Sequence, residues 1–186
     1  MQEVDNILRI LKETKLALQE EDSHKLRDLS NQTNNTASRT QDPDNIAIAV
    51  IIYSMSKIIE RDQYRKLKGW KKFYKQFLKK LDLIILDINK KNSRELKKNI
   101  QELRESIDNL SGRLKEFIQD VFRKASINKA SKIYEHGISM EKTSKLLGIS
   151  LWELANYSGA KADTLTEELK TIKTKDRIKF AEGVFS

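Results

Sequence analysis

The sequence predicts an all-α protein: a helical bundle body with a long antiparallel helix hairpin, followed by a C-terminal tri-helical helix-turn-helix module. One Pro and six Gly in 186 residues leave few positions that break a helix. Apolar residues recur every three or four positions in most segments, which is the spacing of a helix face. The chain is 38% hydrophobic and 34% charged, as amphipathic helices around a packed core require. We expect the bundle domain at residues 1–125 and the module at 126–186.

The first two helices are predicted at residues 4–20 and 24–40. Leu, Ile and Val recur at helical spacing in the first segment. The second begins with apolar spacing but continues into an Asn/Thr/Ser run at 30–38, where helix propensity is low. The sequence leaves the structure and the role of this run open. If the run is helical and packed, its side-chain amides need hydrogen-bond partners, which would make it a candidate polar interface.

A third helix, from residue 44 to about 61, has the clearest start signal in the chain. Asp42 can cap its N-terminus, and Pro43 occupies the first helical position, where a missing N–H costs nothing. The segment is apolar on nearly every face, which is typical of a helix at the centre of a bundle. Its most apolar run, 46–59, is too short to span a bilayer.

Residues 61–80 carry most of the excess positive charge. They contain nine basic residues and one acidic residue, against a net charge of +9 for the whole chain. Gly69 separates a loop from a basic helix expected at 70–89. In one interpretation, Tyr64, Trp70 and Tyr74 are exposed and stack on unpaired bases. The phosphate contacts would then be Lys66, Lys68, Lys71, Lys72, Lys75 and Lys79. In the other interpretation the aromatic residues face the core and the lysines form a solvated face.

The most regular apolar pattern follows, and we expect one helix from residue 93 to about 125. Its stripe alternates steps of four and three residues, as in a heptad repeat. The stripe consists of Leu96, Ile100, Leu103, Ile107, Leu110, Leu114, Phe117 and Val121. It can be buried within the chain, as the second arm of the hairpin, or it can form a homodimer through residues 96–121. Ser111 and Gly112 are where the helix can kink or split.

Two copies of Gly-Ile-Ser, at 137–139 and 148–150, predict the helix-turn-helix. Gly137 ends one helix, Ser139 caps the next at 140–147, and Ser150 caps the last at 151–158. Ser144 is small enough for a close helix crossing. The residues predicted to face inward are Thr143, Leu147, Ile149, Leu154 and Tyr157. A closing helix is expected at 176–185.

The string "KIYEHGISMEKTSKLLGISLWELANY" (132–157) resembles the small helix-turn-helix of prokaryotic antitoxins of the UPF0175 type. Those modules share "Y-E-x-G-x-I-S", a small-residue helix ending in "L-L-G-[IM]-S", and a following "W-E". The resemblance covers the C-terminal segment and implies an antitoxin-like, DNA-binding factor in transcription regulation. The whole chain is also similar to uncharacterised archaeal helical proteins that carry the same tail, from which no function follows.

The positive charge and the module together predict a nucleic-acid partner, with DNA favoured over RNA. The second helix of such a module enters the major groove, where Ser150, Trp152 and Asn156 would be presented. Nearby phosphate contacts would come from Lys129, Lys132, Lys142 and Lys145. None of the presented residues is Arg or Lys, although Arg is the commonest base-reading residue. The alternative is a protein–protein adaptor that docks a partner through Trp152 and Leu151.

The sequence gives no sign of an enzyme, a metal site or a bound cofactor. There is no Cys, which excludes disulfides and thiolate chemistry. Neither of the two His follows an Arg at the spacing that the helical HEPN ribonucleases require, and no phosphate-binding glycine loop occurs. The N-terminus lacks the features of a signal peptide. We therefore expect a non-enzymatic, cytoplasmic protein with no membrane partner.

Overall fold

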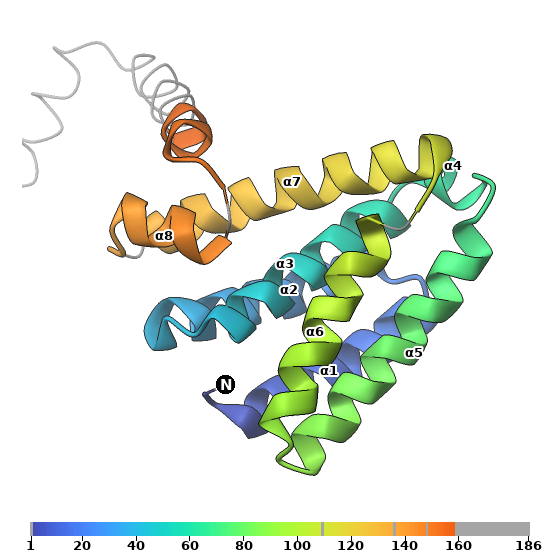
Figure 1. Ribbon diagram of the computed structural model, residues 1–186, viewed down its shortest axis with the longest axis horizontal. Helices are drawn as coiled ribbons and strands as arrows, with labels where there is room; N and C mark the ends of the chain where they lie inside the picture. Colours follow the sequence, from blue (N-terminus) through green and yellow to red (C-terminus); the bar gives the residue numbers. More distant parts are fainter. Residues whose placement is uncertain (1, 109, 136, 148, 159–186) are drawn as a thin grey trace, which may run out of the picture.

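The computed structural model describes residues 2–108, 110–135, 137–147 and 149–158 (Figure 1). These residues form helices joined by short turns and contain no strand, which confirms the predicted all-α class. The helix expected at 176–185 lies outside the described residues. None of the described helices has the length and apolar character that crossing a bilayer would take.

The first three helices are α1 (Val4–Gln19), α2 (Ser23–Thr40) and α3 (Pro43–Ile59). The predicted start of α3 is confirmed: Pro43 opens the helix, and the Asp42 side chain accepts a hydrogen bond from the Asp44 backbone N–H at 2.9 Å. The central position predicted for α3 is also confirmed, because it packs against α1, α2, α4, α6, α7 and α8.

The polar run at 30–38 is helical and forms part of the α2–α3 contact. Ser30 and Thr33 are fully buried. Their hydroxyls donate to backbone carbonyls, Ser30 to Ala49 on α3 at 2.7 Å and Thr33 to Leu29 one turn earlier at 2.8 Å. Low propensity is thus overcome by packing and by hydroxyls that bond to the backbone. The buried Asn34 amide oxygen has no hydrogen-bond partner among the described residues.

The predicted hairpin is formed by α5 (Trp70–Asn89) and α6 (Ser93–Asp108), with the short α4 (Asp62–Arg65) before it. The single helix predicted for 93–125 is wrong. Helix α6 ends at Asp108, and α7 (Gly112–Glu135) starts after a break in which Gly112 has φ 59°. The described residues of the stripe pack on the main core from both helices. Leu96, Ile100, Leu103, Leu114 and Val121 are buried, and Leu110 and Phe117 are partly buried against them.

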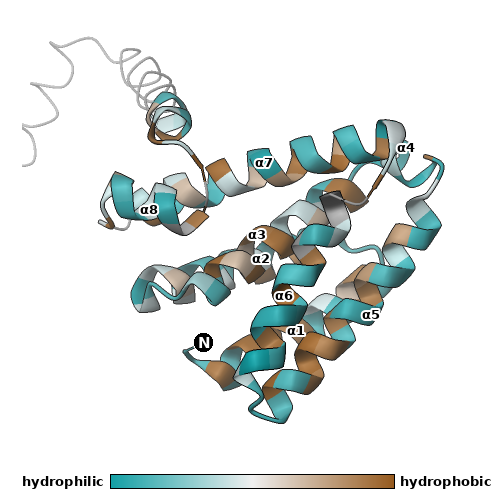
Figure 2. Ribbon diagram, viewed as in Figure 1, coloured by the Kyte–Doolittle hydropathy of each residue, from teal (hydrophilic) through white to brown (hydrophobic). Residues whose placement is uncertain are grey.

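Helix α7 runs unbroken through the boundary expected between residues 125 and 126. In Figure 1 it lies across one edge of the bundle, with α4 near its N-terminal end and α8 (Met140–Leu147) at its C-terminal end. The main core lies among α1, α2, α3, α5, α6 and the first half of α7. A second, smaller core joins the second half of α7, α8 and the helix at 151–158 to α2 and α3. Figure 2 shows the hydrophilic side of α6 turned to the viewer.

Candidate nucleic-acid interface

Six exposed lysines lie on α5 and on the segment that precedes it. This lysine face consists of Lys66, Lys68, Lys71, Lys72, Lys75 and Lys79. None of the six forms a hydrogen bond or an ion pair with another described residue. At 3.6 residues per turn, Lys71, Lys75 and Lys79 lie on the side of α5 opposite its buried residues. The structure therefore brings together the six lysines that the sequence predicted.

A glycine fixes the start of the basic helix. Gly69 has φ +95°, a conformation that side chains rarely adopt, and a Cβ placed there would lie 3.3 Å from a methyl carbon of Leu114 on α7. The loop thus turns sharply and passes close to α7. This turn is what brings Lys66 and Lys68 beside the lysines of α5.

The aromatic residues among these lysines are turned inward, so the interpretation in which Tyr64, Trp70 and Tyr74 are exposed is wrong. Tyr64 is buried with its ring 5.2 Å from that of Phe117, and Trp70 is buried and stacked on Tyr74 at 5.3 Å. The Tyr74 hydroxyl donates to the Leu18 carbonyl at 2.6 Å, and burial raises the pKa of this hydroxyl. The interpretation in which the aromatics face the core is correct, and the lysine face has no aromatic platform for unpaired bases.

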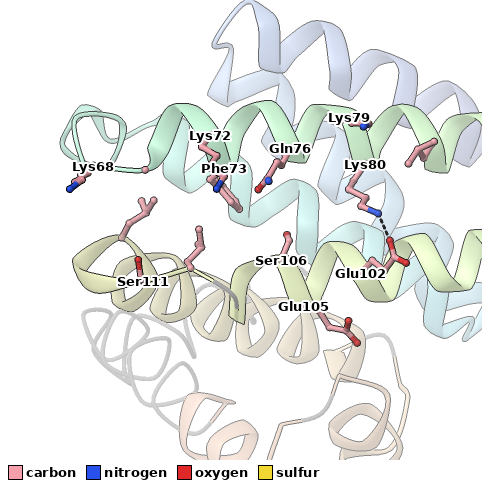
Figure 3. Close-up of a pocket in the computed structure, with 14 residues that line it drawn as sticks. Lys68, Lys72, Phe73, Gln76, Lys79, Lys80, Glu102, Glu105, Ser106 and Ser111 are labelled. Atoms are coloured by element: carbon pink, nitrogen blue, oxygen red, sulfur yellow. Dashed lines mark hydrogen bonds and ion pairs between the residues drawn. The ribbon is translucent and has the colours of Figure 1, made fainter.

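A groove of about 670 Å³ runs beside the lysine face, between α5 on one side and α6 with the start of α7 on the other (Figure 3). Lys72 and Gln76 line the α5 wall, and Glu105 and Ser111 line the opposite wall. At one end Lys80 is paired with Glu102 across the groove, and this hydrogen bond lowers the pKa of the Glu102 carboxyl. The α5 wall is therefore cationic, and the facing wall carries the acidic groups.

The two short helices predicted after α7 are present in the described residues, and each begins at a serine cap. The Ser139 hydroxyl accepts from the Lys142 backbone N–H at 3.3 Å. Ser150 and Glu153 form a reciprocal capping box: Glu153 N–H donates to the Ser150 hydroxyl at 3.1 Å, and Ser150 N–H donates to the Glu153 carboxylate at 3.0 Å. All five residues predicted to face inward are buried or half-buried, and Ser144 is buried.

Glu153 also ties the module to α7. The Arg123 Nε donates to its carboxylate at 2.8 Å. Hydrogen bonds from Ser150 and Arg123 lower the pKa of Glu153 to about 2. Arg123 was not among the predicted site residues. Its signal in the sequence is weak, because the ion pair joins residues that are thirty positions apart.

The four lysines predicted as phosphate contacts of the module are less accessible to a phosphate than those of the lysine face, because each is buried or has a partner in the chain. Lys129 is fully buried, so the prediction that it contacts phosphate is wrong. Lys132 is half-buried and donates to the Asn31 side chain at 3.1 Å. Lys142 is exposed and hydrogen-bonded to Gln41, and Lys145 is exposed and paired with Glu141 at 2.7 Å. Two of the four are thus accessible, each with a partner in the chain.

The outer face of the helix at 151–158 is mainly apolar. Trp152 is 74% exposed and Leu151 is 48% exposed. Asn156 is exposed on the same helix, and the exposed Ser150 at its start has its hydroxyl engaged in the cap. This face presents an indole and an aliphatic side chain with a single amide beside them.

No group of three or more metal-ligating side chains occurs in the part of the chain that the structure describes. Comparisons with models of protein families, with curated proteins and with solved structures find no match to this chain. The resemblance of residues 132–157 to an antitoxin helix-turn-helix therefore stays a prediction from sequence.

Proposed function

We propose that this is a non-enzymatic nucleic-acid-binding protein that holds the phosphate backbone with its lysine face. The observation that carries the proposal is the set of six exposed lysines, none of which forms a hydrogen bond or an ion pair with another described residue. Among them, Lys66 lies close enough to the Asp62 carboxylate to add to the larger effect of the Arg65 hydrogen bond, which lowers the pKa of that carboxyl. Like charges gathered on one helix repel each other, and a polyanion relieves that repulsion. Lysines that already pair with carboxylates, such as Lys145, would have to exchange one anion for another and would gain less.

The spacing of these lysines suits a regular row of phosphates. Lys71 and Lys79 are eight residues apart on α5, which is about 12 Å along the helix axis. A duplex strand advances about 3.4 Å per phosphate along its axis, so this span faces roughly three or four phosphates. Base stacking needs exposed aromatic rings. Since Tyr64 and Trp70 are buried, we propose duplex backbone as the target.

We propose DNA rather than RNA because of the helix-turn-helix at the other end of α7. Its sequence resembles antitoxin modules that bind DNA, and Asn156 is exposed where an amide can contact adenine. The proposed role is that of a DNA-binding regulator or antitoxin-like factor. The lysine face would supply most of the affinity, since base-reading arginines are absent from the exposed helix.

A salt titration tests the lysine face. With six phosphate contacts, the slope of log K against log salt is expected to be about −5, so affinity falls on the order of 10³-fold between 50 and 200 mM salt. Fluorescence anisotropy with random duplex DNA, duplex RNA and single-stranded RNA measures both quantities. In the triple variant Lys71→Glu, Lys75→Glu and Lys79→Glu, the slope should become shallower, from about −5 to about −3 or closer to zero. The affinity for duplex DNA should also fall steeply.

A matched control carries the same change in net charge elsewhere. The variant Lys12→Glu, Lys90→Glu and Lys97→Glu alters three exposed lysines outside the lysine face. It should retain most of the affinity and nearly the full slope. Equal losses in both triple variants would mean that only net charge matters, and absence of binding at low salt would refute the proposal.

A second candidate function is a protein–protein adaptor, and the exposure of Trp152 favours it. An indole that is 74% exposed lies beside the half-exposed Leu151, and a protein partner could cover both. The variant Trp152→Ala separates the two functions. If the module docks a protein, Trp152→Ala should abolish the cross-linking of that protein to this chain in cells and leave the affinity for DNA unchanged. If the module contacts DNA, the same change weakens DNA binding.

A further inference from the structure

Lys129 is the one fully buried lysine among the described residues, and it lies where three helices meet. Its side chain comes from α7 and has 0% of its surface exposed. The Nζ atom donates to the Asn31 side-chain oxygen of α2 at 3.1 Å. It also lies 4.4 Å from the centre of the Tyr53 ring of α3. The amine therefore sits in the seam between α7 and the α2–α3 pair.

The polar partners in this seam do not neutralise a positive charge on the amine. Lys129 forms no ion pair with a carboxylate of the described residues. The Lys132 ammonium donates to the same Asn31 oxygen at 3.1 Å, so two amines share one amide acceptor. Burial, and secondly the charge of Lys132, lower the pKa of Lys129 from 10.5 to about 7.

The other titratable groups around the seam come from α3 and α7. On α3 these are Tyr53 and Lys57, whose ammonium lies 5.8 Å from the centre of the same ring. On α7, Glu135 accepts a hydrogen bond from the Ser131 hydroxyl at 3.1 Å. Lys57 adds further positive charge near the ring, and α2 presents an uncharged amide to the amine. The face of the Tyr53 ring attracts a cation, whereas burial and the charge of Lys132 oppose protonation of Lys129.

The apolar contact that closes the seam is small. In the part of the chain that the structure describes, the second core holds nine buried hydrophobic residues, three of them alanines, whereas the main core holds 27. Segments with few buried apolar groups open at lower free energy than the centre of a protein. The second half of α7, α8 and the helix at 151–158 are attached to the body mainly through this core.

We infer that the seam is a proton-sensitive joint: protonation of Lys129 loosens the second half of α7 from α2 and α3, and the helix-turn-helix moves with it. This inference does not depend on the proposed DNA binding. In the closed seam Lys129 binds a proton only near pH 7, whereas in an open, hydrated seam it does so near its ordinary pKa of 10.5. Between these values the open form binds more protons, so lowering the pH toward 7 favours opening.

The expected change in the population of the open form with pH follows from the two pKa values of Lys129, about 7 in the closed seam and 10.5 in the open one. Lowering the pH by one unit within this window raises the open population up to tenfold. Below about pH 7 both forms are protonated and the effect levels off. Between pH 8.5 and 7.0 the open population should rise on the order of tenfold. The joint therefore responds across the range from neutral to mildly alkaline pH.

Hydrogen exchange of the full chain at pH 8.5 and 7.0, corrected for intrinsic exchange rates, tests the joint. Amides at 126–135 and 151–158 should be less protected than those in the middle of α1 and α5, because the seam opens without global unfolding. Their protection factors should fall about tenfold at the lower pH. In Lys129→Met this fall should disappear. In the matched control Lys132→Met, which removes the neighbouring amine on the same helix, a fall of similar size should remain.

Three results would overturn the inference. These are seam amides as strongly protected as those of α1 and α5, protection in the wild type that does not change with pH, and an equal fall in Lys129→Met. If that variant does not fold, NMR titration of the side-chain carbons in lysine-labelled wild type gives the answer directly. A Lys129 resonance that titrates near pH 7 supports the joint, and one that titrates above pH 10 refutes it.

Discussion

Replacing the buried lysine by methionine should stabilise the protein. Methionine has a similar length and an unbranched, flexible chain, so Lys129→Met can fill the same space without an amine. A pKa lowered from 10.5 to about 7 means that folding works against the protonation of Lys129. At about 1.4 kcal/mol per pKa unit, this costs roughly 4 kcal/mol of unfolding free energy at pH 7.

The net gain is smaller than this cost because the substitution also removes a hydrogen bond. The bond to Asn31 contributes about 1 kcal/mol, although Lys132 still donates to the same oxygen. We therefore expect Lys129→Met to raise the free energy of unfolding by about 2–4 kcal/mol at pH 7. The advantage over wild type should shrink by about 1.4 kcal/mol per pH unit above 7, because the wild-type amine is then uncharged in the folded state.

Urea denaturation followed by circular dichroism at pH 7, 8 and 9 measures both quantities. The wild type should gain stability relative to the variant as the pH rises. A difference between the two proteins that is the same at pH 7 and pH 9 would refute the argument, because it would show that Lys129 does not titrate in this window. A less stable variant at pH 7 would mean that the amine contributes more through its contacts than its burial costs.

Three further changes test other parts of the structure. Gly69→Ala should lower the free energy of unfolding by about 1–2 kcal/mol in denaturant titrations, because φ is +95° and the added carbon meets Leu114; no loss would show that the turn relaxes freely. Asn99→Ala should cost about 1–3 kcal/mol in the same assay, since it removes the 2.7 Å hydrogen bond to the buried Asp87 carboxylate. The Glu153 carboxyl should titrate near pH 2 by NMR, so its contribution to stability is kept above its unfolded pKa of 4.5 and lost as the pH falls through 2. A midpoint near 4.5 would show that the capping box is not formed in solution.

The sequence predicted helices well wherever local signals and burial agree. Asp42 and Pro43 mark the start of α3, and Gly69 precedes α5, whose bounds match the prediction. The doubled Gly-Ile-Ser marks both short helices of the module. In each case a cap or a turn residue stands directly before a helical apolar pattern, so two independent signals give the same boundary.

The heptad pattern over 93–125 could not show that this segment forms two helices, α6 and α7. The stripe keeps its spacing across Ser111 and Gly112 because α6 and α7 both pack on the main core. Periodicity reports which side of a helix is buried, and it does not report whether the axis continues. Gly112, in a left-handed conformation, is the signal that should have outweighed the pattern.

The sequence predicted the exposure of the six lysines between residues 66 and 79 and missed the burial of Lys129. Lys129 lies four residues after Ala125 and four before Ile133, both fully or almost fully buried, so it stands on the buried stripe of α7. The expectation that Lys129 contacts phosphate takes no account of this stripe, and a buried lysine is rare enough that the stripe alone is a weak signal. Asn31 and Tyr53, which surround its amine, come from elements that no local pattern connects to α7.

The continuity of α7 gives the molecule a fixed internal length. Its 24 residues form a helix of about 36 Å, with the lysine face beside its first turns and the helix-turn-helix at its other end. No flexible linker separates the two surfaces within the described residues. With the seam closed, the lysine face and the helix-turn-helix are two binding surfaces held at a fixed separation by α7. A target whose two binding positions match that spacing can engage both surfaces at once and is bound with avidity. A target with another spacing engages one surface at a time and is bound only with the affinity of that surface.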